Sequence, residues 1–421
     1  MILSTKSYKG ARDIYPEDMR LRRYIFDTWT WVCESYGYER YDAPIIEPVE
    51  LFAAKSGEEI VNDQTYTFTD RGGRKVTIRP EMTPSVARMV AARRQETPYP
   101  ARLYSISNFM RYEKPQNGRE REFWQLNVDL FGASDIEADA EIIAVSDAIL
   151  KKFGASEQMY SIRINDRKLI NYLMREYLGL DEKKALGMIK LFDRFAKIAK
   201  EDFNLQAMEI MGSSDASKVI GLIDVASIDE LPESVKNSEF LDDILAVSQK
   251  LLDRGVKVEF DVTLMRGFDY YTGIVFEVFD KNPANNRAMF GGGRYDGLVG
   301  LFGVEDLPVV GVAPGETTMI EFLKAWDLIP KLKPATDIYV IPIEVDASKV
   351  TSELRAKGMN VAVDISDRKM NKKIRAAVKL GVPYVLFVGE EEIKSGKFKL
   401  KNLETQEEKF LAIDEIVKVK Q

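Results

Sequence analysis

Histidine is absent from all 421 residues of the chain. This absence excludes Ser-His-Asp and Cys-His catalysis, imidazole metal ligands and imidazole acid–base chemistry. The single cysteine, Cys33, excludes an intrachain disulfide and any metal site built from several cysteines. If the protein is an enzyme, it must act by positioning and electrostatics, with carboxylates and arginines as its functional groups.

The chain also lacks any apolar run of about 18 residues, and residues 1–10 lack the apolar stretch of a secretory signal. These two absences predict a cytosolic protein with no membrane-spanning segment. The length of 421 residues is enough for two or three domains. A net charge of −7 argues against a protein that coats nucleic acid generally, but it leaves room for a local basic patch.

Residues 101–132 contain two strand-like runs that flank a polar loop, residues 114–121. The loop contains a proline and the turn pair Asn117-Gly118, which indicates a hairpin. The second run alternates at period two between an apolar set and a polar set, namely Trp124, Leu126, Val128 and Leu130 against Gln125, Asn127 and Asp129. Three polar side chains in register lie either on the protein surface or on the wall of a polar cavity.

Arginines at the rim of this hairpin favour the cavity. Arg111 lies where the first strand meets the loop, and Arg119 and Arg121 lie where the loop returns. The guanidinium group is suited to bidentate recognition of phosphate. A hairpin with arginines at its rim and amide and carboxylate groups on its floor could hold a phosphate beside a polar organic group.

Residues 109–113 (Phe-Met-Arg-Tyr-Glu) and 123–125 (Phe-Trp-Gln) resemble motif 2 of the class II aminoacyl-tRNA synthetases, and the fuller pattern is similar to the histidyl-tRNA synthetase family. Residues 266–271, Arg-Gly-Phe-Asp-Tyr-Tyr, closely resemble a segment peculiar to that family and its relatives. The glycine run at 290–297 lacks the Lys-Ser/Thr of a phosphate loop. In the family this run lines the amino-acid pocket, where glycine permits close approach.

The resemblance implies an α+β fold, with a class II synthetase antiparallel sheet flanked by helices, a helical insertion and a C-terminal α/β anticodon-binding domain. We expect the catalytic domain at residues 1–325, the insertion at 166–254 and the α/β domain at 335–421. The residue patterns agree with this division, because charged, Leu/Ile-rich helical stretches dominate the proposed insertion. Strand and helix patterns alternate after residue 337.

Several local patterns make predictions about individual elements. An amphipathic stripe predicts a helix over residues 17–36, with Gly37 as its C-cap. Alternation predicts a strand over 258–264. Glu81 and Thr83 are placed at a strand end, before a helix that begins at about Ser85.

The resemblance also implies the reaction. Histidine and ATP would give histidyl-adenylate and pyrophosphate, and the histidyl group would then pass to the 3′ end of histidine tRNA. ATP and Mg²⁺ are the expected cofactors, with no metal site built from protein ligands alone. The family further implies a cytoplasmic homodimer, whose interface includes the first helix and the strand after it.

Site residues are carried over from the same resemblance. Arg111 and Arg266 are the catalytic candidates at the α-phosphate. The ATP-binding set is Arg111 at the α-phosphate, Glu113 and Phe123 at the adenine, and Arg119 at the β- and γ-phosphates. The histidine-binding set is Glu81, Thr83, Gln125, Asp129, Arg266, Tyr270, Tyr271 and Tyr295, with Asp129, Tyr271 and Tyr295 around the imidazole. The tRNA-binding set is Gln116, Arg368, Lys369, Lys372 and Lys373.

The basic residues between Arg368 and Lys379 form a run on one predicted helix. Such a run is usually a solvated face. Beside an acidic catalytic half, a basic helix on an appended domain also fits an RNA contact.

The chain departs from the family at residues 316–318, where Glu-Thr-Thr replaces an arginine expected to bind the γ-phosphate. Either Arg119 or Arg121 takes that role, or the affinity for ATP is lower. The departure leaves open a regulatory paralogue that binds histidine or a partner without charging tRNA. A synthetase for a different amino acid is disfavoured by residues 266–271.

Overall fold

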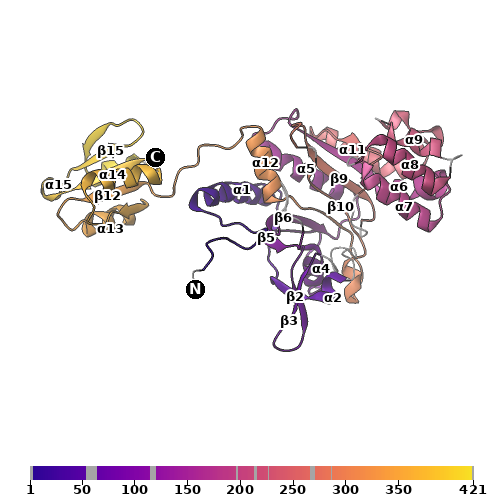
Figure 1. Ribbon diagram of the computed structural model, residues 1–421, viewed down its shortest axis with the longest axis horizontal. Coiled ribbons are helices and arrows are strands. Elements are labelled where there is room, and N and C mark those ends of the chain that lie inside the picture. Colours follow the sequence, from indigo (N-terminus) through magenta and orange to yellow (C-terminus); the bar gives the residue numbers. More distant parts are fainter. Residues whose placement is uncertain are drawn as a thin grey trace. The chain divides into compact units, whose positions relative to one another are not determined.

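A computed structural model describes residues 3–53, 64–113, 120–195, 198–212, 216–225, 227–265, 271–285 and 287–419 (Figure 1). The chain divides into two compact units. The first contains residues 1–13 and 22–328, and the second contains residues 14–21 and 329–421.

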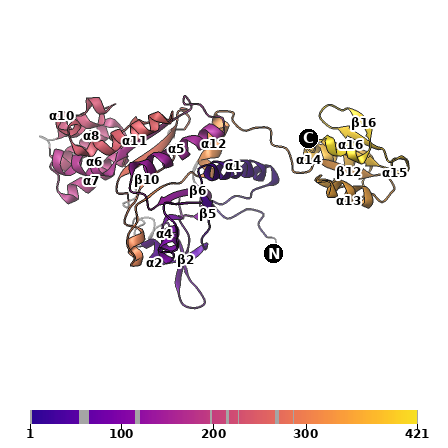
Figure 2. The ribbon, with the colours of Figure 1, turned by 180° about the vertical axis from the view of Figure 1, so that it is seen from behind.

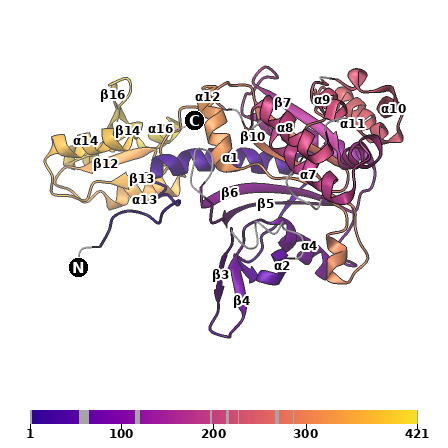
Figure 3. The ribbon, with the colours of Figure 1, turned by 45° about the vertical axis from the view of Figure 1, so that its right-hand side comes forward.

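The first unit is built on an eight-stranded sheet in the order β1-β5-β6-β11-β10-β9-β7-β8. The pairs β1–β5 and β7–β8 at the two edges are parallel, and the inner pairs are antiparallel. The strands are β1 (Glu39–Arg40), β5 (Ala101–Met110), β6 (Glu122–Phe131), β7 (Tyr160–Asp166), β8 (Glu259–Phe260), β9 (Ile274–Asp280), β10 (Ala288–Arg294) and β11 (Val309–Val312). The predicted hairpin is the pair β5–β6, two long strands that lie side by side in Figure 3. This mainly antiparallel sheet confirms the predicted fold class.

Helices cover one face of this sheet, as the view from behind shows (Figure 2). They are α1 (Pro16–Ser35), α5 (Ile136–Lys152), α11 (Asp242–Asp253) and α12 (Glu316–Ala325). Leu126, Val128 and Leu130 of β6 are fully buried on this side. The predicted stripe of α1 is buried as well, including Ile25 and Trp29, and the helix ends one residue before its predicted boundary.

The other face of the sheet carries α4 (Thr83–Ala92), whose Val86, Ala87 and Val90 pack with Phe131 and Val275 in one apolar cluster. Next to α4 lies a small antiparallel sheet in the order β2-β4-β3, with the short helix α2 (Val49–Ala53). Its strands are β2 (Ile46–Pro48), β3 (Tyr66–Thr69) and β4 (Lys75–Ile78). The odd-numbered residues of β6 therefore face α4 and the space beside it.

Short helices form a cluster at one end of the first unit (Figure 1). They are α6 (Arg167–Tyr172), a short π-helix (Leu173–Tyr177), α7 (Glu182–Asp193), α8 (Lys200–Met211), α9 (Ala216–Ile223), α10 (Glu233–Lys236) and two short 3₁₀ helices (Ile228–Glu230, Glu239–Leu241). The sequence predicts that helices dominate this segment. Helix α11, at the end of the proposed insertion, packs on α5 and joins the helical layer over the sheet.

Two local predictions were wrong in their boundaries. The strand predicted over 258–264 is reduced to β8, because Asp261 closes a turn by accepting hydrogen bonds from the backbone N–H and the hydroxyl of Thr263. Helix α4 begins at Thr83, two residues before its predicted start. Pro84 is compatible with the first turn of a helix, where its missing N–H costs nothing. Thr83 is therefore a helical residue rather than part of a strand end.

The second unit contains a five-stranded sheet in the order β13-β12-β14-β15-β16. Strands β13 (Val361–Val363), β12 (Ile338–Pro342) and β14 (Tyr384–Val388) are parallel, and β15 (Phe398–Asn402) and β16 (Glu408–Leu411) complete it in antiparallel fashion. The helices are α13 (Ser348–Ala356), α14 (Met370–Leu380), α15 (Glu390–Ser395) and α16 (Ile413–Lys418). The α/β alternation is as predicted, except that α15 was not foreseen. In the described parts of both units, no helix has the length and apolarity needed to cross a membrane.

Candidate active site

A cavity of about 1160 Å³ lies against the polar face of β6. Its wall is formed by residues of β6, β9, β10 and β11 and by the first turns of α4 and α12. The cavity collects predicted site residues that are far apart in the sequence, namely Glu81, Thr83, Arg111, Glu113, Phe123, Gln125, Asp129, Tyr271 and Tyr295. The other predicted residues of this site, Arg119, Arg266 and Tyr270, lie outside the described residues, as does Gln116 of the tRNA-binding set. Arg368, Lys369, Lys372 and Lys373 belong to the second unit.

Arg111 lies one residue after β5 and pairs with the ring of Phe123 on the opposite strand. Its Nε donates a hydrogen bond to the carbonyl oxygen of Pro80 (2.9 Å), and its guanidinium carbon lies 5.2 Å from the centre of the Phe123 ring. Among the described residues, Pro80 is the one hydrogen-bond partner of this side chain. The terminal nitrogens Nη1 and Nη2 are therefore left to bind an anionic ligand, next to an aromatic surface on which a flat ring can stack.

Glu81 and Thr83 are held in place by the arginine that precedes them. Arg79 is 3% exposed, and it donates hydrogen bonds to Asp42 (2.9 Å) and to the carbonyl oxygens of Ala43 and Asn108. These bonds tie the segment between β4 and α4 to the neighbouring strand β5. Glu81 is 4% exposed on the cavity wall, where a buried carboxylate is suited to a cationic partner such as an ammonium group.

Asp129 forms the floor of the cavity together with Tyr295, and its carboxyl group also approaches Tyr41. It is 4% exposed, Tyr295 donates its hydroxyl hydrogen to Oδ1, and the Tyr41 hydroxyl lies 3.5 Å from Oδ2. Burial raises the pKa of Asp129 to about 7, although the hydrogen bonds from Tyr295 and Tyr41 act in the opposite direction. The floor is thus a carboxyl group that titrates near neutral pH, and in its ionised form it would bind an N–H donor strongly.

Glycines make room for this floor. A Cβ atom at Gly311 would lie 2.9 Å from the Tyr295 hydroxyl and 2.9 Å from the carbonyl oxygen of Val128, and it would also collide with Asp129. A Cβ at Gly293, in the predicted glycine run, would lie 3.0 Å from the ring of Tyr271. Glycine at these positions lets the tyrosines and the carboxylate come together against the backbone of β10 and β11.

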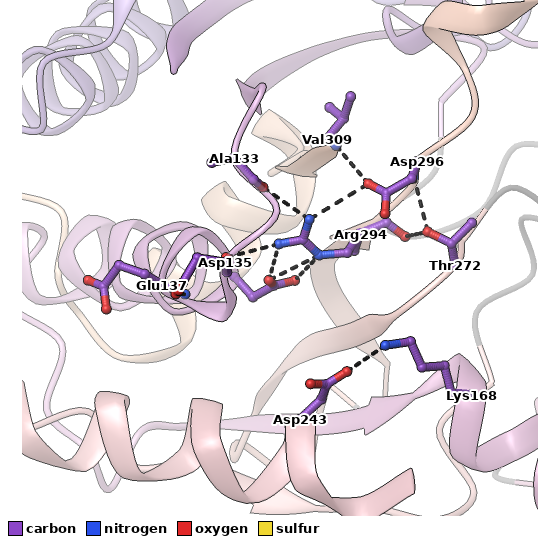
Figure 4. Close-up of polar contacts among 10 residues, drawn as sticks. Ala133, Asp135, Glu137, Lys168, Asp243, Thr272, Arg294, Asp296 and Val309 are labelled. Carbon is purple, nitrogen blue, oxygen red and sulfur yellow. Dashed lines mark hydrogen bonds and ion pairs between the residues drawn. The ribbon is translucent and has the colours of Figure 1, made fainter. Parts of the chain in front are cut away.

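A buried ion pair fixes Arg294, the residue before Tyr295. Figure 4 shows the polar contacts of the Arg294 guanidinium group. Arg294 is 8% exposed and pairs with Asp139 of α5, whose side chain is fully buried, while its Nη1 also donates to the carbonyl oxygen of Ala133 (3.1 Å). On the other side of Tyr295, Asp296 accepts a hydrogen bond from the backbone N–H of Val309 (2.8 Å). Both neighbours of Tyr295 are therefore anchored, which holds its hydroxyl on Asp129.

Glu316, where the chain departs from the family pattern, and Arg121 make contacts within the protein. Glu316 is 2% exposed and accepts two hydrogen bonds from Arg22 (2.7 and 2.8 Å). Arg121 donates from Nε to the carbonyl oxygen of Glu113 (3.1 Å) and lies 4.0 Å from the centre of the Tyr112 ring. Arg121 is not among the described residues that line the cavity. This geometry does not support Arg121 in the γ-phosphate role.

Three side chains on or below the cavity wall were missed by sequence reasoning. Tyr41 comes from the extended segment before β2, and no local pattern marked it. Arg163 of β7 and Arg287, beside the start of β10, add positive charge to the wall. Arg163 is paired with Asp261 (3.1 Å). Arg287 could have been identified from the sequence, because it is a lone arginine in an Asn-rich segment just before the glycine run.

The raised pKa of Asp129 predicts a pH-dependent stability. The carboxyl group holds its proton up to about pH 7 in the folded state and up to about pH 4 in the unfolded state. The free energy of unfolding should therefore fall as the pH rises through this window, because folding above pH 7 buries a charge. Asp129→Asn removes this penalty and should stabilise the free protein by about 2–3 kcal/mol more at pH 8 than at pH 5.

Urea unfolding of both proteins at the two pH values measures this difference, and other titrating groups cancel in the comparison. An equal effect of Asp129→Asn at pH 5 and pH 8 would show that the carboxyl group does not titrate between them.

Comparison with known proteins agrees with this arrangement. The sequence profile of histidyl-tRNA synthetase matches residues 10–315, and that of the anticodon binding domain matches residues 337–421. The chain is 41% identical to the histidine–tRNA ligase of Leptospira biflexa over 95% of its own length and 94% of the relative's, and 38% identical to that of Thermoplasma volcanium over 97% and 96%.

Solved structures of histidyl-tRNA synthetases have the same fold as this chain. The histidyl-tRNA synthetase of Nostoc sp. superposes with a TM-score of 0.85 over all of both chains, at 24% identity. The apo enzyme of S. aureus superposes with a TM-score of 0.74 over 99% of each chain, at 26% identity. With a matching profile over most of its length and relatives above 35% identity along nearly the whole sequence, the chain belongs to the histidyl-tRNA synthetase family.

Proposed function

We propose that this protein is a histidine–tRNA ligase, which activates histidine with ATP and transfers it to the 3′ end of histidine tRNA. The observation that carries the proposal is the cavity itself, where Arg111 and Phe123 lie on one β-hairpin with the buried carboxyl group of Asp129. Family relatives named histidine–tRNA ligase support the same activity.

The activation step places the histidine carboxylate against the α-phosphorus of ATP. A carboxylate oxygen forms the new bond to phosphorus, the bond from phosphorus to the bridging oxygen breaks, and pyrophosphate leaves. The carboxylate is already ionised at pH 7, so no general base is needed. The barrier comes from bringing one anion to another, and the protein lowers it by orientation and positive charge.

Each part of the cavity would then have one task. Arg111 and Arg266 neutralise the α-phosphate, and Arg119 binds the β- and γ-phosphates. Phe123 stacks on adenine, with Glu113 beside it. The amino and carboxylate ends of histidine are held by Glu81, Thr83 and Gln125, and the imidazole by Asp129, Tyr271 and Tyr295, with Tyr270 next to them. The neutral imidazole offers one donor, which the ionised Asp129 accepts.

Mg²⁺ is part of the proposal because it enters with the ATP phosphates and needs only one or two protein carboxylates. Glu120 and Glu321 supply carboxylates on the cavity wall, and the described residues contain no group of three or more acidic or cysteine side chains that could hold a metal alone. When bound, the ion would share the negative charge of the phosphates.

We also propose a cytoplasmic homodimer that binds tRNA through its second unit. Exposed apolar side chains on α1 and around the start of β2, namely Trp31, Ile45 and Ile46, fit an interface between two copies. The basic residues Arg368, Lys369, Lys372 and Lys373 fit a contact with the phosphates of tRNA. The catalytic domain at 1–325, with its insertion at 166–254, and the α/β domain at 335–421 remain our assignment of the parts.

The regulatory paralogue is less well supported. Its main argument was that residues 316–318 lack the arginine of the family pattern, and in the structure the buried Glu316 is paired with Arg22. The structural neighbour from Bacillus halodurans, described as an ATP phosphoribosyltransferase regulatory subunit/histidyl-tRNA synthetase, shares the fold at 24% identity.

Pyrophosphate exchange into ATP, measured with each of the twenty amino acids in turn, tests the proposed function. We expect exchange with histidine alone, because the floor of the cavity is built to pair with a polar ring. Exchange that follows another amino acid would reassign the substrate, and no exchange with any of them would favour the paralogue.

A further inference from the structure

The loop between β13 and α14 in the second unit exposes an isoleucine almost completely. Ile365 is 93% exposed, more than any other large apolar side chain of the described residues. It follows the carboxyl end of β13, which is the edge strand of the parallel part of the sheet. In open α/β sheets, ligands bind outside the carboxyl ends of the parallel strands. Ile365 therefore lies at the ligand-binding end of the sheet, one strand away from the place between β12 and β14 where the strand order reverses.

A buried carboxylate holds this loop in shape. Asp364, whose side chain is fully buried, accepts hydrogen bonds from the Tyr339 hydroxyl (2.9 Å) and from the backbone N–H of Ser366 (2.9 Å). Its own backbone N–H donates to the carbonyl oxygen of Val340 (2.9 Å), which extends the pairing with β12. These hydrogen bonds fix the backbone on both sides of Ile365, so its exposed side chain is held in a defined position.

The same carboxylate also orders a cation beside Ile365. Arg368 Nη2 lies 3.2 Å from Asp364 Oδ2, and Arg368 Nε donates to the Ser366 hydroxyl (2.7 Å). Burial disfavours the charged form of Asp364, but the hydrogen bonds from Ser366 and Tyr339 and the charge of Arg368 together outweigh it, and the pKa of Asp364 lies below its usual value. The carboxylate is therefore ionised at neutral pH and keeps Arg368 next to the exposed isoleucine.

Further positive charge continues along α14. Lys369 precedes the helix, and Lys372 and Arg375 are exposed on it. An apolar side chain with a row of cations beside it matches the chemistry of an unpaired nucleotide, whose base is flat and apolar on its faces and whose phosphates are anionic. A protein partner would offer no comparable reason for the cations, unless it were strongly acidic.

We infer that Ile365 is a contact for one unpaired base of the anticodon loop of the tRNA, and that Asp364, Ser366 and Tyr339 are positioning residues that hold it there. This inference rests on the proposed function, because it takes the tRNA from that function and the anticodon loop from the matching domain profile. It adds a base contact to a surface for which phosphate contacts alone were proposed.

The test is a cycle of side-chain removal and base removal. Wild-type protein and Ile365→Ala are titrated with the anticodon stem-loop of histidine tRNA, intact and with an abasic site at each loop position in turn. We expect Ile365→Ala to weaken binding of the intact RNA by about 5- to 50-fold, the scale of losing one base contact. At one loop position the abasic RNA should bind both proteins equally, because the contact is already gone.

Two variants serve as controls. Ile393→Ala removes an isoleucine of the same unit that is 45% exposed on α15, and it should bind the intact RNA like the wild type. Changing Arg368, Lys369, Lys372 and Lys373 to Gln should flatten the salt dependence of binding, whereas Ile365→Ala should leave the salt slope unchanged because it contacts no phosphate. Ser366→Ala should give a smaller loss at the same loop position.

The inference is overturned if Ile365→Ala binds the intact stem-loop as tightly as the wild type. It is equally overturned if the variant loses the same factor with intact RNA and with every abasic RNA, since the side chain would then touch no base. Histidine-dependent pyrophosphate exchange by Ile365→Ala should match the wild type, and a loss of exchange would contradict a role of Ile365 confined to RNA binding. Absence of exchange in the wild type itself would contradict the proposed function without affecting the RNA cycle.

Discussion

Replacing Arg111 with alanine should lower histidine-dependent pyrophosphate exchange by roughly 10²-fold or more, the usual effect of losing one preorganised donor to transition-state charge. The side chain is suited to this role because Pro80 fixes its Nε and Phe123 supports the plane of the guanidinium group. The terminal nitrogens then meet the phosphate without reorganising, which is the source of the effect. Arg266→Ala should cause a loss of similar size.

The loss should appear in the rate of exchange with the fold intact, since Arg111 lies on a cavity wall and not in the apolar core. Arg102→Ala is a matched control on β5, the strand that Arg111 follows, because Arg102 pairs with Glu141 (2.7 Å) and does not line the cavity. Exchange at the wild-type rate in folded Arg111→Ala would refute the assignment to the α-phosphate. A loss of equal size in Arg102→Ala would instead indicate a general effect on the hairpin.

Asp129→Ala should raise the Michaelis constant for histidine by about 10- to 100-fold and leave that for ATP nearly unchanged. The substitution leaves the imidazole N–H without its acceptor in a buried pocket, which costs about 1–3 kcal/mol and more when the lost partner is charged. The structure sharpens this expectation, because Asp129 is 4% exposed and also accepts the Tyr295 hydroxyl. Asp129→Glu should keep partial activity, since a carboxylate remains.

Titration of both substrates separates the competing roles of Asp129. A structural partner of the phosphate-binding arginines would worsen the parameters for histidine and ATP together, and a residue without function would change neither. Tyr295→Phe is a useful companion variant, because it removes the hydroxyl on Asp129 and keeps the ring. It should raise the Michaelis constant for histidine less than Asp129→Ala does, and a defect confined to ATP would contradict the proposed floor of the pocket.

The strand β6 shows what sequence alone could predict of this site. Alternation along residues 122–131 separates Leu126 and Val128 from Gln125 and Asp129, and strand geometry turns that separation into two faces. The structure places the apolar face under the helices and the polar face on the cavity. The resemblance of residues 109–113 and 123–125 to motif 2 identified the hairpin for the same reason, because its information is local.

Other features depended on which strands become neighbours. Tyr41 reaches Asp129 because β1 pairs with β5, and Gly311 lies opposite Asp129 because β11 pairs with β6. From its position in the loop, Arg121 was a candidate phosphate ligand. In the structure it donates a hydrogen bond to the carbonyl oxygen of Glu113 and lies over the ring of Tyr112. Contacts of this kind join residues that share no local pattern.

The sequence by itself determined the two faces of the central hairpin and the chemistry available without histidine, because periodicity and residue type act locally. Its resemblance to a known family implied the fold class. The tertiary structure alone decided that Asp129 is buried enough for its pKa to reach about 7, and that Arg294 and Asp139 pair to hold Tyr295 against it. Burial and ion pairing depend on how strands and helices that are distant in the sequence pack together, and local residue patterns do not predict that packing.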